Sequence, residues 1–447
     1  MNLRRTSRGL LLALLPVVAS ACGTGAAGRD DPGPVDTGSR QHTAAAAPDV
    51  VATEPSSTSA TDPPARLPEV SVVRAVADIE GRVALIDATG QVGLHEDALL
   101  SADGTTVVVV NAGDETTTVR WIDTATSEIL TEIELTGELD AVATDPNAEV
   151  VGLVDRAGDR SDDAIAPGRE TTEIVVADVD GEQFRRRLKG NVVPEAFSDW
   201  RLESSNAPGA AFVIEFSPPL HPTHYRVRLL DVATGTIGLP LNLRDKSQSV
   251  DQLMAGISRS SVVASDPGLL FTLYRGHHDE GNGNYAFIHT LAFGNGVWCL
   301  EVPSVMDLAN LPGAVAVTPD GDDLVAVSSN GTIASIAIAD IIDFEAMPIF
   351  DEAVTVGDST DHPPTITTAG EHLLVGLGTT LLEVDPATLT ALTSATMPIA
   401  VDAVASGAAG VVVAGEGRLL LLDERRMMVA ASEVPEGLGT VVRIVMG

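Results

Sequence analysis

The sequence predicts an all-β fold built from repeated four-stranded units, and three observations support this prediction. After Pro68 the chain consists of short β-branched runs separated by turn residues, which is typical of short strands. An apolar run that ends in Asp and continues into a Thr-bearing turn recurs along the chain. A second turn recurs about 20 residues upstream, as in Ala102–Gly104 and Pro319–Gly321, so each unit contains four short strands.

The turn that begins with Asp is the clearest part of the repeat. An Asp carboxylate accepts hydrogen bonds from backbone N–H groups two or three residues further on, and Gly or Asn supplies a positive φ, so each copy predicts a hairpin. In one unit Gly and Asn occupy this place instead, at Leu291–Gly296. Clear copies are Leu85–Gly90, Trp121–Thr126, Leu229–Gly235 and Glu383–Thr388, and degraded copies contain Asp178, Asp340 and Asp423.

The spacing of these turns predicts how many units there are. They fall near positions 87, 123, 178, 231, 292, 340, 385 and 423, and the intervals match one propeller blade each. Eight hairpins favour an eight-bladed β-propeller over residues 68–447. The alternative is seven blades with one terminal hairpin outside the ring, because the ends of repeat arrays are often atypical.

The first blade is expected to combine both ends of the domain. Three strands come from residues 70–94, and residues 439–446 return as the innermost strand, which removes exposed strand edges. We expect this last strand to bury Val441, Val442, Ile444 and Val445. Aromatic residues make up only 3% of the chain, so aliphatic side chains are expected to fill the space between blades.

The N-terminus predicts export. Arg4, Arg5 and Arg8 form a positive region, and Leu10–Val18 form an apolar stretch far shorter than the roughly 20 residues of a spanning helix. Residues 1–21 are therefore interpreted as a signal peptide. Residues 23–67 contain almost no large apolar side chains, so they cannot form a core and are predicted to be a disordered tether.

The segment Ala19-Ser20-Ala21-Cys22 resembles the lipobox of bacterial lipoproteins, although that family usually has Leu where this chain has Ala19. The resemblance implies lipidation of Cys22 and anchoring to the outer face of the cytoplasmic membrane, and two acyl chains give a stable anchor. The alternative is ordinary cleavage after Ala21, which releases a secreted protein.

Charge narrows the set of partners. The formal net charge is −36, from 63 acidic and 27 basic residues, and such a surface repels phosphate backbones. Nucleic acid is therefore not expected as a partner. The expected partners are the membrane, through the lipid on Cys22, and an unidentified protein or glycan. The chain is expected to be a monomer.

The turn motifs resemble those of the YVTN and WD40-like β-propellers, whose repeats carry a P-D-G turn, a short apolar strand and an I-D-T-x-T hairpin. The WD40 pairing of Gly-His with Trp-Asp in every blade is missing. Segments such as Tyr225–Asp231, Leu270–Tyr274 and Ala286–Leu291, which leads to Trp298-Cys299-Leu300, are similar to uncharacterised secreted propellers of actinobacteria. The resemblance implies the fold and no particular activity.

Three functions remain open. A surface-tethered module that binds a protein or glycan is favoured. The alternative is an enzyme of lactonase or sugar-oxidising type at the central channel, which related propeller families suggest, and the third is a purely structural envelope lipoprotein. The chain contains no Gly-Lys pair of a P-loop and no G-x-S-x-G, so no catalytic residue, cofactor or metal site is assigned.

One loop combines the residue types of a binding site. Arg275, His277, His278, Asp279 and Glu280 lie in a glycine-bounded segment, and imidazoles with carboxylates suit a partner contact or a divalent ion. The competing interpretation is a solvated loop, because adjacent loop residues seldom converge on one ion. Cys299 is expected to be a small buried hydrophobe, and His289 a hydrogen-bonded structural residue.

Overall fold

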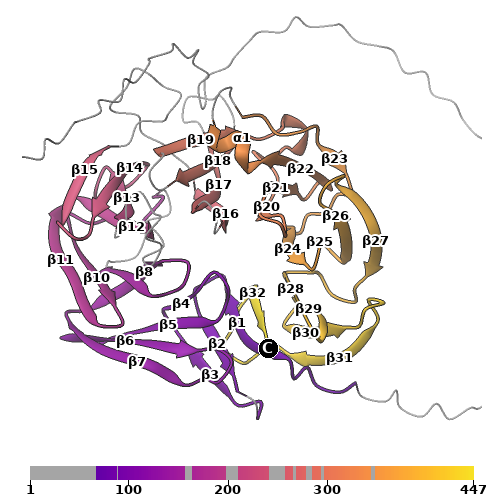
Figure 1. The fold of residues 1–447 in the computed structure, drawn as a ribbon, viewed down its shortest axis with the longest axis horizontal. Coiled ribbons are helices and arrows are strands. Elements are labelled where there is room, and N and C mark those ends of the chain that lie inside the picture. The colour runs from indigo at the N-terminus through magenta and orange to yellow at the C-terminus, as the bar shows by residue number, and fades with distance from the viewer. Residues whose placement is uncertain are drawn as a thin grey trace, which may run out of the picture.

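In the computed structural model the chain forms a ring of eight blades around a central channel (Figure 1). Each blade is a sheet of four antiparallel strands, which confirms the eight-bladed prediction. The structure describes residues 67–87, 89–156, 164–197, 210–240, 257–264, 268–277, 284–292, 296–343 and 348–447.

In each of the first four blades, one strand lies next to the channel and the fourth lies at the rim (Figure 1). Blade 1 contains β32 (Val441–Met446), β1 (Val73–Asp78), β2 (Val83–Ile86) and β3 (Val92–His95); blade 2 contains β4 (Ala98–Leu100), β5 (Thr106–Ala112), β6 (Thr116–Asp123) and β7 (Ile129–Thr136); blade 3 contains β8 (Leu139–Thr144), β9 (Val150–Asp155), β10 (Thr171–Asp178) and β11 (Gly181–Lys189); blade 4 contains β12 (Asn191–Phe197), β13 (Ala210–Ser217), β14 (His224–Asp231) and β15 (Thr236–Pro240).

The last four blades follow the same order, and two short helices lie in their connections. Blade 5 contains β16 (Ile257–Ala264), β17 (Leu269–His277), β18 (Asn284–Ala292) and β19 (Gly296–Glu301), followed by the 3-10 helix η1 (Ser304–Met306); blade 6 contains β20 (Gly313–Val317), β21 (Asp323–Ser328), β22 (Thr332–Ala337), α1 (Ile338–Asp343) and β23 (Val354–Thr355); blade 7 contains β24 (Thr365–Ala369), β25 (His372–Leu377), β26 (Thr380–Asp385) and β27 (Thr390–Thr396); blade 8 contains β28 (Ala403–Gly407), β29 (Gly410–Gly415), β30 (Arg418–Leu422) and β31 (Met428–Glu433).

The C-terminal strand closes the ring, as predicted. β32 is the innermost strand of blade 1 and pairs with β1, with Ile444 opposite Val76. Val441 and Ile444 are buried, but Val442 is 49% exposed, so the prediction that it is buried was wrong. The pairing of β32 with β1 skips Val442, because Arg443 lies opposite Ala77 and Val441 lies opposite Asp78. Val442 therefore lies at a bulge, outside the core that receives both Val441 and Ile444.

Eight apolar clusters hold the ring together, one between each pair of neighbouring blades. We call each of these contact regions a seam. Aliphatic side chains fill most of them, as expected. The seam between blades 7 and 8, for example, is made of Leu, Ile, Val and one Met. The seam between blades 4 and 5 is different, because aromatic rings dominate it.

The Asp turns form by the local chemistry that predicted them. The Asp123 carboxylate accepts hydrogen bonds from the N–H groups of Ala125 at 2.9 Å and Thr126 at 2.7 Å. Blade 6 is the exception, because Asp340 lies in helix α1 rather than in a tight turn. Ile338 and Ile341 are buried one helical turn apart, so packing against the core overrides the degraded turn motif.

Candidate functional site

The connections between strands divide between the two faces of the ring. On the first face, which we call the turn face, lie the connections from first to second strand and from third to fourth strand, counted outward from the channel. Thr124 shows that these two kinds of turn are neighbours, since its N–H donates to the Thr105 carbonyl at 3.0 Å. The other face, the loop face, carries the connections from second to third strand and those that lead to the next blade.

The predicted loop of Arg275 to Glu280 belongs to the loop face. β17 ends at His277 and β18 begins at Asn284, so the segment between them is a connection from second to third strand. The side chains of His277, His278, Asp279 and Glu280 lie outside the described residues. Of the predicted set, only the side chain of Arg275 is placed, and its Nη1 donates to the Asn310 carbonyl at 3.3 Å.

The base of this loop is braced by the connection to blade 6. Asn284 Nδ2 donates to Asn310 Oδ1 at 2.8 Å, and Asn310 Nδ2 donates to Asp307 Oδ1 at 2.6 Å. Gly276 faces Tyr285 across the hairpin, and a Cβ at Gly276 would lie 2.3 Å from the Tyr285 hydroxyl oxygen. A larger residue at Gly276 would force the Tyr285 ring to move, so glycine gives the ring its place beside the strand.

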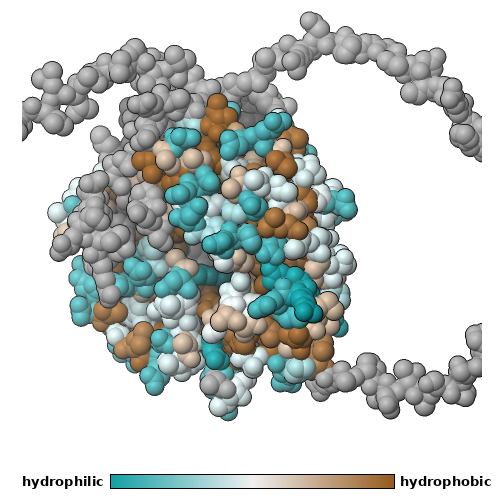
Figure 2. Space-filling model, turned by 45° about the vertical axis from the view of Figure 1, so that its right-hand side comes forward, coloured by the Kyte–Doolittle hydropathy of each residue, from teal (hydrophilic) through white to brown (hydrophobic). Residues whose placement is uncertain are grey.

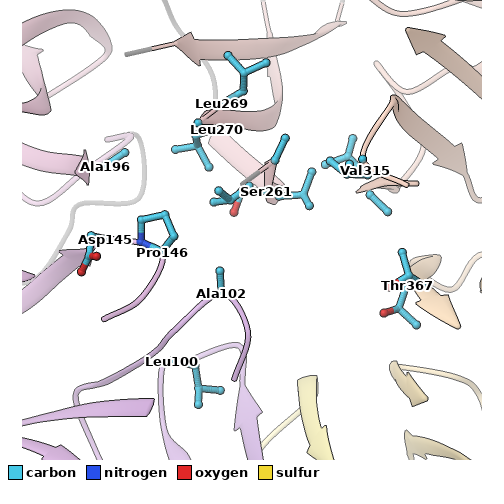
Figure 3. Close-up of a pocket in the computed structure, with 18 of the residues that line it drawn as sticks. Leu100, Ala102, Asp145, Pro146, Ala196, Ser261, Leu269, Leu270, Val315 and Thr367 are labelled. Atoms are coloured by element: carbon cyan, nitrogen blue, oxygen red, sulfur yellow. The ribbon is translucent and has the colours of Figure 1, made fainter. Parts of the chain in front are cut away.

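A cavity of about 880 Å³ occupies the central channel (Figure 3). Its wall comes from the innermost strands and from the turns that follow them, so it lies toward the turn face. The close-up shows Ala102, Pro146, Leu270 and Val315 among the residues around the space. The wall therefore combines apolar side chains with polar ones such as Asp145, Ser261 and Thr367.

Two carboxylates of the cavity wall are bound into their own turns. Asp145 accepts hydrogen bonds from the N–H groups of Val150 at 2.8 Å and Asn147 at 3.3 Å. Burial raises the pKa of Asp145 to about 6 despite these bonds. Asp320 accepts a hydrogen bond from Thr318 Oγ1 at 2.7 Å, and this bond lowers its pKa. Both residues serve the fold of their turns.

The arginine among the described residues of the cavity wall is also engaged in hydrogen bonds. Arg443 lies on β32, and its Nη2 donates to the carbonyls of Ser101 and Ala102, each at 2.7 Å. Burial lowers its pKa, while the negative charge of Asp103 partly offsets that effect. The guanidinium therefore links blade 1 to the first turn of blade 2.

Glu195 differs from the other charged groups of the wall. It lies at a bulge of β12, where the register shifts between Pro194 and Ala196. Glu195 borders the cavity and is half-buried, and desolvation by the surrounding protein raises the pKa of its carboxyl group to about 7. Glu195 can therefore gain or lose a proton near neutral pH, as a group that transfers protons must.

Behind Glu195 lies the seam between blades 4 and 5, which we call the aromatic seam. The rings of Tyr225 and Tyr274 stack with centroids 5.4 Å apart, and Tyr274 stacks on Phe287 at 5.5 Å. His289 lies against both tyrosines, with its ring centroid 5.9 Å from each of theirs. Cys299 pairs with His289 across neighbouring strands, and both are buried.

The polar groups of this seam are held uncharged. Burial lowers the pKa of His289 to about 3, so its imidazole is neutral at physiological pH. Burial also raises the pKa of Tyr225 and Tyr274 well above the usual value, and the carboxyl group of Glu195 adds to this effect. His289 Nε2 has no hydrogen-bond partner, so the prediction of a hydrogen-bonded histidine was wrong for that atom. The prediction of a buried Cys299 is confirmed.

Sequence reasoning did not identify the aromatic seam as a unit. The available indication in the sequence is the clustering of all three tyrosines between residues 225 and 285. Which of them meet depends on how blade 4 packs on blade 5. Local spacing carries no information about that contact.

In the part of the chain that the structure describes, no group of three His, Cys, Asp or Glu side chains lies close enough to hold a metal ion. None of the helices placed there is long and apolar enough to cross a membrane. Cys22 lies outside the described residues.

No protein-family model and no curated protein sequence matches this chain. Among solved structures it is similar to apo AztD from Citrobacter koseri, with 13% identity over 84% of this chain and 97% of that one, at a TM-score of 0.48. It is also similar to the dihydro-heme d1 dehydrogenase NirN in complex with DHE, with 13% identity over 83% of this chain and 75% of that one, at a TM-score of 0.48.

A third similar structure is the β-propeller domain of Cps50 (Swd1) from Myceliophteria thermophila, with 9% identity over 74% of this chain and 93% of that one, at a TM-score of 0.39. Identities and scores this low carry no conclusion about binding or activity. The eight-bladed architecture rests on the strand pairing of the chain itself.

Proposed function

We propose that this chain is an extracytoplasmic, lipid-anchored β-propeller that binds a protein or glycan partner through its loop face. The sequence supports the anchor, since Cys22 follows a short apolar run and a positive N-terminal region. A rigid ring on a tether suits an interaction module, because loops on a rigid scaffold are where binding residues concentrate.

The observation that supports this proposal is the braced base of the Arg275 loop on the loop face. Arg275 Nη1 donates to the Asn310 carbonyl at 3.3 Å, and Asn284 Nδ2 donates to Asn310 Oδ1 at 2.8 Å. The connection from β17 to β18 therefore starts from strand ends that are held by the connection to blade 6, which suits a loop that presents binding residues.

The second candidate function is an enzyme at the central cavity, and Glu195 is the observation that favours it. A carboxyl group with a pKa of about 7 at a cavity wall suits proton transfer. Against this function, Asp145, Asp320 and Arg443 are bound to backbone groups of their own or neighbouring turns. The interaction module is therefore the better supported proposal.

The anchor is tested by labelling cells with an alkyne fatty acid. The wild-type protein is expected to be labelled, and Cys22→Ala is expected to lose the label. Equal labelling of the two proteins, or none in either, would contradict the anchor.

The partner surface is tested by replacing His277, His278, Asp279 and Glu280 with Ala and measuring partner capture from cell-surface extracts. Capture is expected to fall while the melting temperature stays nearly unchanged, because exposed loop substitutions alter stability by only about 0.5 kcal/mol each. The control is the pair of variants at Asp114 and Glu115, two exposed acidic residues in a loop-face connection of blade 2. Equal capture by both sets of variants would remove this loop from the proposal.

A further inference from the structure

The central cavity is large enough for an organic molecule. Its volume of about 880 Å³ lies within the range of small-molecule sites. Partly buried aliphatic side chains line it from the innermost strands of blades 2, 5 and 6, namely Leu100, Val263 and Val317. Figure 2 shows hydrophilic and hydrophobic residues interspersed over the outer surface in view, whereas the cavity gathers these aliphatic groups around one space. A ligand with an apolar body therefore suits the cavity.

Glu195 is a charged group of this wall that the fold leaves without a partner. Among the described residues, none donates a hydrogen bond to its carboxyl group or forms an ion pair with it. Desolvation alone raises its pKa to about 7, and neither a hydrogen bond nor a positive charge opposes that effect. A desolvated carboxylate without a partner costs free energy, and a cation from outside the chain would offset this cost.

The other charged groups of the described wall are already bonded within the protein. Asp145 and Asp320 accept hydrogen bonds inside their own turns. Arg443 donates to two backbone carbonyls of blade 2. With Glu195, the described wall carries three carboxyl groups and one guanidinium, in a chain of net charge −36. The cavity therefore repels an anionic ligand and attracts a cationic one.

The residues behind Glu195, in the aromatic seam, supply no positive charge either. The hydroxyl groups of Tyr225 and Tyr274 are neutral, because burial raises the pKa of both. The His289 imidazole is neutral as well, since burial lowers its pKa to about 3. Cys299 is buried in the same cluster. None of these described groups can therefore pair with the Glu195 carboxylate.

An organic ammonium ion is the cation that suits one carboxyl group in an aliphatic wall. A metal ion needs several ligands, and the described residues include no group of three that could hold one. An ammonium group needs only one carboxylate, with which it forms a charge-assisted hydrogen bond. The hydrocarbon part of the same molecule can lie against Leu100, Val263 and Val317.

We propose that the central cavity binds an organic amine, whose ammonium group pairs with the Glu195 carboxylate and whose apolar body lies against the aliphatic wall. This inference depends neither on the lipid anchor nor on the proposed partner of the loop face. Binding is coupled to a proton, because the carboxyl group must be ionised to pair with the ammonium group.

The test uses three probes of one shape and different charge: aminoadamantane, adamantanol and adamantane carboxylate. Each is titrated into the purified protein by isothermal titration calorimetry at pH 6 and at pH 8. The amine is expected to bind about ten-fold more tightly at pH 8, because the ionised fraction of a group with a pKa of about 7 rises about ten-fold over this range. The alcohol is expected to bind more weakly than the amine at pH 8, with no dependence on pH, and the carboxylate is expected not to bind.

Proton release gives a second measurement. At pH 7, roughly half a proton is expected to leave the protein for each amine bound, since Glu195 is about half protonated in the empty cavity. Titration in buffers with different enthalpies of ionisation measures this release. Adamantanol is expected to release none.

Glu195→Gln keeps the size of the side chain and removes its charge. At pH 8 it is expected to weaken amine binding about ten-fold or more and to leave adamantanol binding unchanged. Its remaining pH dependence is expected to be about two-fold or less, from Asp145, whose pKa is about 6. Asp320→Asn is the matched control on the wall and is expected to change amine binding by less than about two-fold, because that carboxylate is held in its own turn.

A further variant locates the bound amine. Ser261 is exposed on the cavity wall (Figure 3), so Ser261→Trp is expected to fill the space and to abolish binding of both the amine and the alcohol. Binding of adamantanol by Glu195→Gln shows that this variant retains an intact cavity. The proposal is overturned if the wild type does not bind the amine at millimolar concentration, or if Glu195→Gln binds it equally well. Tighter binding of the carboxylate than of the amine, or amine binding that survives Ser261→Trp, also overturns it.

Discussion

The seam between blades 7 and 8 and the aromatic seam between blades 4 and 5 fill the same kind of space with different chemistry. The first contains only apolar side chains, with Leu374 and Leu420 at its centre and almost fully buried. The second buries His289, Tyr225 and Cys299 among its rings. Aliphatic packing gives stability at every pH, whereas buried polar groups make stability depend on protonation.

This difference indicates that the aromatic seam does more than hold two blades together. An aliphatic seam was available to the fold, since the ring uses mainly aliphatic side chains elsewhere. The aromatic seam also lies between the cavity wall at Glu195 and the platform of the Arg275 loop at Tyr285. It therefore connects the two places where function is proposed.

The largest expected effect concerns the aliphatic seam that the last strand closes. Deleting residues 439–447 removes β32 from blade 1 and exposes the core between blades 8 and 1. The loss of Val441 and Ile444 alone costs roughly 3–6 kcal/mol in transfer free energy, comparable to the net stability of a domain. We expect no cooperative thermal transition in circular dichroism.

The control for this deletion is the removal of residues 23–66, which is expected to leave the melting temperature unchanged because their sequence contains almost no large apolar side chains to add to a core. Melting of the C-terminal truncation within a few degrees of the parent protein would contradict the split-blade closure.

A second prediction concerns the stability that a single residue contributes to the seam between blades 7 and 8. Leu420→Ala, at a site that is 1% exposed, is expected to lower the free energy of unfolding by about 2–5 kcal/mol, from lost transfer energy and the cavity that remains. The loss should be the same at pH 5 and pH 8, because no titratable group belongs to this cluster. Urea unfolding at both pH values gives the measurement, and Leu392→Ala on the surface is the matched control. A pH-dependent loss would contradict the comparison of the two seams.

Sequence patterns predicted the parts of the fold that depend on local chemistry. The hydrogen bonds that Asp123 accepts come from residues two and three positions further on, so the turn needs no distant partner. For this reason the Asp turns, and with them the eight blades, could be counted from the sequence. The prediction of a tight turn at Asp340 was wrong, because tertiary packing of Ile338 and Ile341 favours a helix there. Val442 was misplaced because a bulge in the pairing of β32 with β1 has no signature in the sequence.

The candidate site was harder to predict because it is assembled from distant segments. Tyr225 and Tyr274 belong to different blades and meet only when those blades pack. The raised pKa of Glu195 depends on the protein around it and on a bulge in β12, neither of which has a sequence signature. Sequence could identify the residue types of the Arg275 loop, but it could not show that Asn310 braces the base of that loop.

The third prediction concerns the cavity side of the aromatic seam. The pKa of Glu195 in the folded protein is about 7, above its ordinary value of 4.5, so the folded state retains this proton between those values while the unfolded state loses it. Stability contributed by the protonated group is therefore present below pH 4.5 and lost as pH rises to 7. Glu195→Gln is expected to raise the free energy of unfolding at pH 8 by roughly 1–3 kcal/mol and to change it little at pH 4.5.

Urea unfolding of the wild type and Glu195→Gln across this pH range gives the measurement. Asp180→Asn is the control, because Asp180 is an exposed acid in the Asp turn of blade 3. Equal gains at pH 4.5 and pH 8 would show that the carboxyl group is not the source of the effect.

The smallest expected change in the free energy of unfolding at neutral pH follows from replacing His289. Its pKa of about 3 lies below the ordinary 6.5, so between these values the unfolded state binds more protons and stability falls as the solution is acidified. His289→Leu removes a buried polar ring whose Nε2 has no hydrogen-bond partner. At pH 7 the variant is therefore expected to be within about 1 kcal/mol of the wild type or slightly more stable. At pH 4.5 it should be clearly more stable than the wild type, because it has no imidazole to protonate on unfolding. A fall in the free energy of unfolding at pH 7 as large as that of Leu420→Ala would show that the imidazole is well packed and hydrogen-bonded in the core. The two seams would then differ in the shape of their side chains and not in how their stability depends on pH.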